Sequence, residues 1–304
     1  MANYFITGAS GCVGHYVLDV LLGNPDHHYY LLVRNPQKLR LDLRQYPNVT
    51  LIQEDLANIE SHARLLKEID YLVHLAADWG GNEGNFDYTL LLFNLLDPVR
   101  IKKVIYFSTA SILGSDNRPV FAAEKYGTHY IRSKYRIYKT IPSLRIADKI
   151  ITIFPTWVLG GDSRHPYSHA LKGILDLAKW FWLIKYFTIN LSFHFIHARD
   201  MARIVKYLLE NDRPERAYVL GNEPITATAF LREVGSFYGQ KVGFQLPISL
   251  TLVQLLAKLT WRLLHPWDIY SMNRKHFIHQ TVQARDFGLP TDLTTIASIL
   301  QSTK

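Results

Sequence analysis

Short apolar runs alternate with amphipathic segments through the first half of the chain. The apolar runs are three to eight residues long and rich in β-branched and aromatic residues, which is typical of buried strands. They cover residues 4–6, 29–33, 49–53, 71–77, 103–107 and 149–156. The segments between them include helical patterns near residues 12–22, 59–69, 86–96 and 123–140. This alternation predicts an α/β fold in which helices cover both faces of a doubly wound parallel sheet.

The character of the chain changes after a polar, turn-rich stretch at residues 160–166. We place a domain boundary there, between a sheet-containing domain at 1–163 and a smaller, mainly helical part at 164–304. Three elements are predicted in this second part: a short strand at 217–221, a helix over 226–238 capped by Thr226, and an apolar helix over 252–264.

A glycine-rich turn follows the first strand. Gly8 permits a sharp turn, Gly11 leaves the backbone open to a close ligand, and Gly14 lets the next helix pack against the strand. Free N–H groups and the dipole at the helix start favour a phosphate. We therefore predict a dinucleotide site rather than a mere tight turn. Its pyrophosphate would contact Gly8, Ser10, Gly11, Cys12, Val13 and Gly14.

The end of the second strand carries a basic residue. Arg34 lies there, Lys38 and Arg40 are nearby, and the first acid is Asp42. In a dinucleotide fold an acid at this point binds the ribose 2′-hydroxyl of NAD, whereas an arginine accommodates the 2′-phosphate of NADP. We therefore predict NADP as the cofactor, with NAD as the alternative. The alternative is that these basic residues form a solvated loop that binds no cofactor.

The amino-acid composition limits the classes of function that this chain can have. Of the 304 residues, 48% are hydrophobic and 20% charged, as in an ordinary globular protein. The net charge of +8 could suit nucleic acid, but the basic residues are scattered and form no recognisable nucleic-acid module. We predict no nucleic-acid partner and an anionic cofactor or substrate instead. The single cysteine, Cys12, and the lack of a signal-peptide pattern predict a cytoplasmic protein.

Side chains suited to acid–base chemistry follow the fifth strand. Tyr130 and Lys134 lie four residues apart and therefore share one helix face. A nearby ammonium lowers the pKa of a phenol, which can then exchange a proton with a substrate oxygen. A hydroxyl could bond the same oxygen as charge develops. The candidates are Thr109 and, less favoured, Ser108 and Ser111.

These motifs together resemble the extended branch of the short-chain dehydrogenase/reductases, the NAD-dependent epimerase/dehydratase family. The resemblance covers nearly the whole chain. It rests on the Thr-Gly-x-x-Gly-x-x-Gly turn, Asp55-Leu56, Ala76-Ala77, Ser108-Thr109, Tyr-x-x-Ser-Lys at 130–134, Pro155, His197 to Asp200, and the element at 284–290. It implies a Rossmann-like fold with a smaller, mainly helical C-terminal substrate domain. It also implies that the chain returns to the nucleotide domain near 188–221.

The resemblance assigns roles to individual residues. Tyr130 would be the proton donor or acceptor, Lys134 would tune it and bind the nicotinamide ribose, and Thr109 would orient the substrate oxygen. Asp55 and Leu56 would contact the adenine. The remaining positions implied are Ala76 and Pro155 near the cofactor, and Asp200 in a structural polar network.

The Tyr–Lys spacing occurs twice on the predicted helix, because Tyr135 and Lys139 repeat it. Five residues along a helix correspond to about 140° around its axis, so both pairs cannot face one cofactor. Ser133 before Lys134 matches the family form, which favours Tyr130 and Lys134. Tyr135 and Lys139 are then predicted to lie on the surface.

Three positions depart from the family or invite another interpretation. Tyr88 stands where we align the asparagine of a proton relay, and Phe154 stands where an arginine is usual. His74, in an apolar strand, is predicted to be a buried structural histidine. No second ligand lies at metal spacing, and we predict no metal.

Three functions are compatible with these residues. The favoured one is an NADP-dependent oxidoreductase that moves a hydride between nicotinamide and a hydroxyl/carbonyl carbon of an apolar small molecule. The first alternative is a nucleotide-sugar epimerase that keeps NAD bound. The second is a non-catalytic dinucleotide-binding sensor or assembly factor, against which the intact Thr109, Tyr130 and Lys134 argue.

Residues 170–187 are rich in aromatic and basic side chains. The run is too short and too charged to span a bilayer. The favoured interpretation is a helix that packs the second domain and lines its pocket. Alternatives are a membrane-surface anchor and an apolar tunnel that opens at a membrane. Family members commonly dimerise through two helices beside the active site, which leaves a homodimer open.

Overall fold

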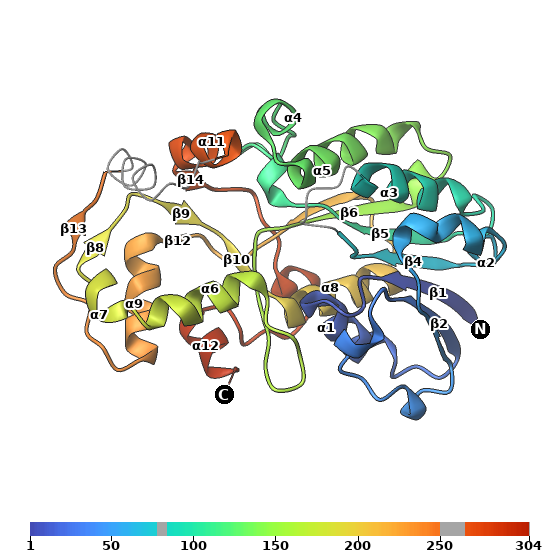
Figure 1. Ribbon diagram of the computed structural model, residues 1–304, viewed down its shortest axis with the longest axis horizontal. Helices are drawn as coiled ribbons and strands as arrows, with labels where there is room; N and C mark the ends of the chain where they lie inside the picture. Colours follow the sequence, from blue (N-terminus) through green and yellow to red (C-terminus); the bar gives the residue numbers. More distant parts are fainter. Residues whose placement is uncertain (78–83, 250–264, 304) are drawn as a thin grey trace.

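The computed structural model describes residues 1–77, 84–249 and 265–303 (Figure 1). The apolar helix predicted over 252–264 lies outside these residues. A seven-stranded sheet has the order β11-β6-β5-β4-β1-β2-β3, and every pairing in it is parallel. Its strands are β1 (Ala2–Thr7), β2 (His27–Leu32), β3 (Val49–Ile52), β4 (Tyr71–His74), β5 (Lys103–Phe107), β6 (Ile150–Pro155) and β11 (Ala217–Leu220).

Helices cover both faces of this sheet, which confirms the predicted doubly wound architecture (Figure 1). On one face lie α1 (Cys12–Leu21) and α8 (Ala198–Glu210), whose apolar sides bury Val17, Leu18 and Met201. On the other lie α2 (Ala63–Leu66), α3 (Gly84–Leu95) and α5 (His129–Thr140), together with the 3-10 segment Leu56–His62. Because side chains point alternately to the two faces of a strand, the central strands contribute residues to the apolar clusters on both faces of the sheet.

The long helix predicted over 123–140 is in fact two helices, α4 (Ala122–Tyr126) and α5. Gly127 separates them, and a Cβ there would lie 2.1 Å from the Ala123 carbonyl oxygen. Thr128 then caps α5 by accepting a hydrogen bond from the Ile131 N–H at 3.3 Å. The local glycine and cap therefore decide the boundary that the apolar periodicity missed.

The C-terminal part forms a second body at the far end of the molecule from β1 and β2 (Figure 1). Its core contains Leu171, Ile174, Phe230 and Ile299. Its helices within the described residues are α6 (His169–Ala178), α7 (Phe181–Ile184), α9 (Ala227–Phe237), α11 (Pro266–Arg274) and α12 (Ile296–Gln301). Short pairs and a triplet of strands complete it: β7 (Trp157–Leu159) with β10 (Phe195–His197), β8 (Phe187–Thr188) with β13 (Leu246–Pro247), and β9 (Ser192–Phe193) with β12 (Ile225–Thr226) and β14 (His276–Phe277).

The aromatic segment does not pack as a single buried helix. Trp180, Trp182 and Tyr186 are 61%, 59% and 53% exposed, whereas Phe181 is fully buried. The helix breaks between α6 and α7, and α7 is only four residues long. A helix that short turns one side chain into the core and the others to the surface. No helix of the described residues combines the length and apolarity that crossing a membrane requires.

His74 is the buried structural histidine that the sequence predicts. Its ring lies between two threonines, with Nδ1 2.7 Å from Thr7 Oγ1 and Nε2 3.0 Å from Thr89 Oγ1. The Ala76 N–H donates to the same Thr7 hydroxyl at 3.2 Å. This network ties β1, β4 and α3 together directly below the ends of the strands. Burial, with a smaller contribution from Lys134, lowers the pKa of His74 to about 3.

We expect His74 to make the protein sensitive to acid. The unfolded chain binds a proton on this ring near pH 6.5, but the folded protein does so only near pH 3. Stability therefore falls as the pH drops below 6.5, by up to about 1.4 kcal/mol per pH unit from this residue. His74→Met should flatten the dependence of the unfolding free energy on pH between 6 and 4, as measured by urea titration. His276→Asn, at an exposed histidine, should leave the slope unchanged; an unchanged slope in His74→Met would refute the assignment.

Candidate active site

The predicted site residues gather at one edge of the main sheet. Because the strands are parallel, the carboxyl ends of β1, β2, β3, β4, β5 and β6 all meet there. The glycine turn follows β1, and Arg34 and Asp55 follow β2 and β3. Ala76 and Thr109 follow β4 and β5, and Pro155 is the last residue of β6. The structure therefore brings the sequence-predicted positions to a common edge.

The glycine turn fits the phosphates of a dinucleotide. Gly8 has a φ of +76°, and a Cβ there would lie 2.6 Å from the Ala76 nitrogen. A Cβ on Gly14 would lie 2.3 Å from the Gly8 carbonyl oxygen. Gly11 is the N-cap of α1, and no side chain caps this helix within the described part of the chain. The first-turn N–H groups and the helix dipole are therefore available to an anion.

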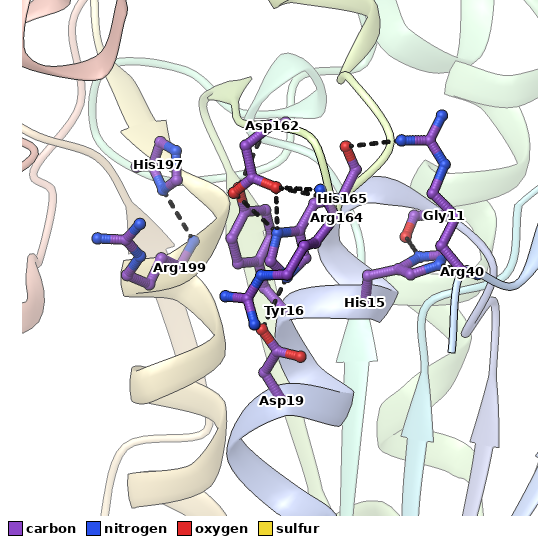
Figure 2. Close-up of polar contacts among 11 residues, drawn as sticks. Gly11, His15, Tyr16, Asp19, Arg40, Asp162, Arg164, His165, His197 and Arg199 are labelled. Atoms are coloured by element: carbon purple, nitrogen blue, oxygen red, sulfur yellow. Dashed lines mark hydrogen bonds and ion pairs between the residues drawn. The ribbon is translucent and has the colours of Figure 1, made fainter. Parts of the chain in front are cut away.

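His15 holds this turn in place through two hydrogen bonds. The Arg40 backbone N–H donates to His15 Nε2 at 2.9 Å, so the neutral ring carries its proton on Nδ1. That proton is donated to the Gly11 carbonyl oxygen, 2.8 Å away (Figure 2). Burial lowers the pKa of His15 and keeps this arrangement neutral. His15 thus connects the turn to the basic loop after β2.

A second polar cluster fastens the segment after β7 to α1. His165 lies between two carboxylates, with Nε2 2.7 Å from Asp19 and Nδ1 2.8 Å from Asp162 (Figure 2). Its ring stacks on Tyr16 at a centroid distance of 3.9 Å. The Tyr16 hydroxyl donates to Asp162 at 3.3 Å and accepts from the Gly161 N–H at 3.2 Å. We call Tyr16, Asp19, Asp162 and His165 the clasp.

The clasp was missed by sequence reasoning, which read residues 160–166 only as a boundary. Its partners are 146 residues apart in the chain, and no local pattern links them. Burial raises the pKa of Asp162, but hydrogen bonds from His165 and from backbone N–H groups hold it below its usual value. The clasp positions the start of the C-terminal part beside the glycine turn.

Arg34 and Asp55 form an ion pair where β2 and β3 end. Arg34 Nη1 lies 3.5 Å from Asp55 Oδ2, and the two side chains are 71% and 40% exposed. Such an exposed pair contributes little to stability and leaves both groups accessible to a ligand. Asp55 also caps the 3-10 segment by accepting from the Ala57 N–H at 3.0 Å, and Leu56 packs against the core.

Thr109, Tyr130 and Lys134 come together where β5 meets α5. The Tyr130 hydroxyl forms a hydrogen bond with Thr109. Thr109 in turn donates to Ser111 Oγ at 3.2 Å. Lys134 is 2% exposed, and its Nζ donates to the Phe107 carbonyl oxygen at 2.7 Å. Lys139, from the alternative pair, is exposed to solvent and cannot occupy this position.

The ionisation of this group differs from the expectation. Burial raises the pKa of Tyr130, and the hydrogen bond with Thr109 offsets only part of the effect. Lys134 was expected to lower this pKa, but its Nζ lies 5.8 Å from the Tyr130 ring centre and burial lowers its own pKa to about 7. A lysine that is partly neutral at pH 7 lowers the pKa of a nearby phenol only weakly. Without a ligand, Tyr130 is therefore a protonated phenol.

Tyr106 is a neighbour that sequence reasoning overlooked. Its ring centre lies 4.8 Å from Lys134 Nζ, and the ring stacks on His74 at 5.9 Å. Its hydroxyl is buried beside Ser108, and burial raises its pKa. The signal available was its place two residues before the predicted Ser108-Thr109 pair. The apolar pattern of this strand predicts only a core position for it.

The departures from the family pattern have structural consequences. Phe154 is buried and meets Tyr138 edge to face at 4.9 Å, so this position serves the core. Tyr88 is half-buried in the first turns of α3, next to Gly84. Asp200 is buried in the first turn of α8, where it pairs with Arg203 at 3.5 Å and accepts from Thr291. Asp200 therefore has the structural role predicted for it.

Comparison with known proteins places the chain among dinucleotide-dependent enzymes. Residues 4–221 match the NAD dependent epimerase/dehydratase family. A sterol-4-alpha-carboxylate 3-dehydrogenase (decarboxylating) of Dictyostelium discoideum is 23% identical over 294 residues, which cover 86% of each chain. An uncharacterized protein of Methanocaldococcus jannaschii is 26% identical over 144 residues, 40% of this chain and 44% of that protein, so this match spans less than half of the relative's length.

Solved structures share the fold over nearly the full chain. A UDP-N-acetylglucosamine 4-epimerase from Methanobrevibacter ruminantium has a TM-score of 0.69 at 18% identity and covers 99% of this chain and 96% of its own. A UDP-glucuronic acid 4-epimerase from Bacillus cereus, solved with NAD, has a TM-score of 0.67 at 16% identity and covers 99% and 97%. At these identities the likeness establishes the fold alone.

The buried Lys134 should cost stability at low pH. Between pH 7 and 10.5 the unfolded chain binds more protons than the folded one, so stability rises with pH through this window. Lys134→Met should therefore raise the melting temperature more at pH 6 than at pH 9.5, by about 2–4 °C for each kcal/mol recovered. Lys139→Met on the same helix provides the control and should show no such difference. A pH-independent effect of Lys134→Met would contradict the depressed pKa.

Proposed function

The chain belongs to the NAD-dependent epimerase/dehydratase family, and within it we propose an NADP-dependent oxidoreductase. It would move a hydride between nicotinamide and a hydroxyl/carbonyl carbon of a small, predominantly apolar molecule. The observation that carries this proposal is the contact of Tyr130 with Thr109 next to the buried Lys134, at the sheet edge that also carries the glycine turn. Residues 1–163, with the return segment at 188–221, would bind the cofactor, and residues 164–304 would bind the substrate.

The residues that would hold the cofactor follow the sheet edge. The backbone from Gly8 to Gly14 would bind the pyrophosphate, with Ser10, Cys12 and Val13 in the turn. Arg34 would accommodate a 2′-phosphate, after giving up its exposed pair with Asp55. Asp55 and Leu56 would contact the adenine, Ala76 and Pro155 would lie beside the cofactor, and Lys134 would bind the ribose. When bound, the nicotinamide supplies hydride transfer.

Tyr130 would donate a proton to the substrate oxygen or accept one from it. Its phenol is protonated in the ligand-free protein, because burial raises its pKa. It can therefore donate to a substrate oxygen that gains negative charge during reduction. Thr109 would turn its hydroxyl proton from Ser111 Oγ, to which it donates at 3.2 Å, towards the same oxygen and orient it. In the reverse direction the same phenol oxygen would take up the proton of an alcohol.

A nucleotide-sugar epimerase is the second candidate. It is favoured by the structural likeness to 4-epimerases over nearly the whole chain. The same Thr109, Tyr130 and Lys134 would serve it, with the hydride returned to the same substrate. Arg34 in place of an acid and the buried Phe154 in place of an arginine argue for the dehydrogenase. Homodimer formation and a cytoplasmic location stay predictions.

Tyr130→Phe should abolish turnover while preserving cofactor affinity. Loss of the positioned proton donor should lower kcat by about 10²- to 10⁴-fold. Turnover would be followed as NADPH oxidation with a panel of apolar ketones and aldehydes, and affinity as quenching of protein fluorescence by NADPH. Tyr135→Phe, from the repeated spacing on the same helix, is the matched control. Undiminished turnover in Tyr130→Phe would remove it from the mechanism, whereas a wild type that binds NADPH but turns over no substrate would favour the non-catalytic sensor.

Arg34→Ala should change the choice of cofactor. If Arg34 binds the 2′-phosphate, the variant should lose about 10- to 100-fold in affinity for NADPH and keep its affinity for NADH, because a charge-assisted contact is worth about 1.5–3 kcal/mol. Arg44→Ala removes an exposed arginine that is paired with Asp42 nearby, and it should leave both affinities unchanged. The affinities would be measured by titrating NADPH and NADH into the wild type and into each of the two variants. Equal losses for NADPH and NADH would contradict a 2′-phosphate role.

A further inference from the structure

An aromatic patch lies on the C-terminal part, remote from the cofactor edge. It consists of large side chains from α7 and the residues that flank it, and from β13 and the segment before it, which are 43–80% exposed. Its members are Trp180, Trp182, Leu183, Tyr186, Phe244 and Leu246. Single exposed apolar residues are common, but a cluster that includes two tryptophans usually marks an interaction surface. The proposed oxidoreductase chemistry uses none of these residues.

The two parts of the patch are joined by strand pairing and by a side-chain hydrogen bond. β8 pairs with β13, and the Leu246 N–H donates to the Tyr186 carbonyl oxygen at 2.8 Å. Gln245 Nε2 donates to the Phe187 carbonyl oxygen at 3.2 Å. These contacts place Phe244 and Leu246 beside the chain that leaves α7. Figure 1 shows α7, β8 and β13 together at the end of the molecule opposite the N-terminus.

Lysines accompany the aromatic patch. Lys179 and Lys185 lie at the ends of α6 and α7, and the exposed Lys241 precedes Phe244 by three residues. Lys185 Nζ sits 5.3 Å from the Tyr186 ring centre. The nearby acid Asp176 is already paired with Lys179 at 2.7 Å. The balance of charge around the patch is therefore positive.

We propose that the aromatic patch binds the surface of an anionic lipid bilayer. Tryptophan and tyrosine favour the boundary between headgroups and acyl chains, where an amphipathic ring meets both environments. Lysines beside them can reach anionic headgroups while their stems cover apolar surface. A second copy of the chain fits the patch less well, because a twofold interface would bring these lysines against themselves. The contact would be peripheral, and it is independent of the proposed reaction.

Vesicle co-sedimentation tests this proposal with the full-length protein. The wild type should sediment with vesicles of phosphatidylcholine and phosphatidylserine at 3:1 and 0.1 M NaCl. It should bind much more weakly to pure phosphatidylcholine, and 0.5 M NaCl should release it. Trp180→Ser with Trp182→Ser should abolish sedimentation. Lys185→Gln with Lys241→Gln should weaken partitioning by about 25-fold, since each lysine near such a surface contributes about fivefold.

Matched controls separate the patch from general charge and hydrophobicity. Phe121→Ser removes an aromatic side chain that is 68% exposed on another part of the surface. Lys67→Gln with Lys125→Gln removes two exposed lysines elsewhere. Both should bind vesicles as the wild type does. The proposal is overturned if the wild type ignores anionic vesicles or if patch variants and controls bind equally. A concentration-dependent dimer in sedimentation velocity, lost in the tryptophan variant, would overturn it in favour of self-association.

Discussion

The structure depends on how closely α1 can approach β1. A side chain at Gly14 would lie 2.3 Å from the Gly8 carbonyl oxygen, and one at Gly8 would lie 2.6 Å from the Ala76 nitrogen. Only glycine allows the helix start to lie against the strand ends. From there His15 reaches the Gly11 carbonyl oxygen, and the clasp ties α1 to the segment after β7. One steric constraint thus sets the glycine turn and the start of the C-terminal part together.

Burial is the second constraint, and it acts on Lys134 in the candidate catalytic group. Lys134 has lost its water and keeps one hydrogen bond to a carbonyl oxygen, with the Tyr106 and Tyr130 rings beside it. An isolated buried ammonium is costly, and its pKa falls to about 7 as a result. Such a perturbed group at the mouth of a sheet is a signature of function rather than of stability. The folded protein tolerates the lysine because the surrounding cores on both sheet faces are extensive.

Local signals made much of the fold and site predictable. The strand at 103–107 was placed with its observed bounds, and Thr226 caps α9 as predicted. The main sheet, the glycine turn and the structural His74 also followed from short patterns. Properties that depend on distant partners did not follow: the clasp joins residues 146 apart, and the pKa of Tyr130 is set by burial that no spacing reveals. The exposed Trp180 and Trp182 were misjudged, because aromatic content alone does not tell which side of a short helix meets the core.

The most direct test of the account is to denature the purified protein and identify any released dinucleotide by mass spectrometry. An oxidoreductase that exchanges its cofactor in every turnover should release little dinucleotide, and what it releases should be NADP. An epimerase regenerates its cofactor in place and should retain it. Near-stoichiometric NAD would therefore contradict both the role given to Arg34 and the choice of a dehydrogenase, and would make the epimerase the better description of this site.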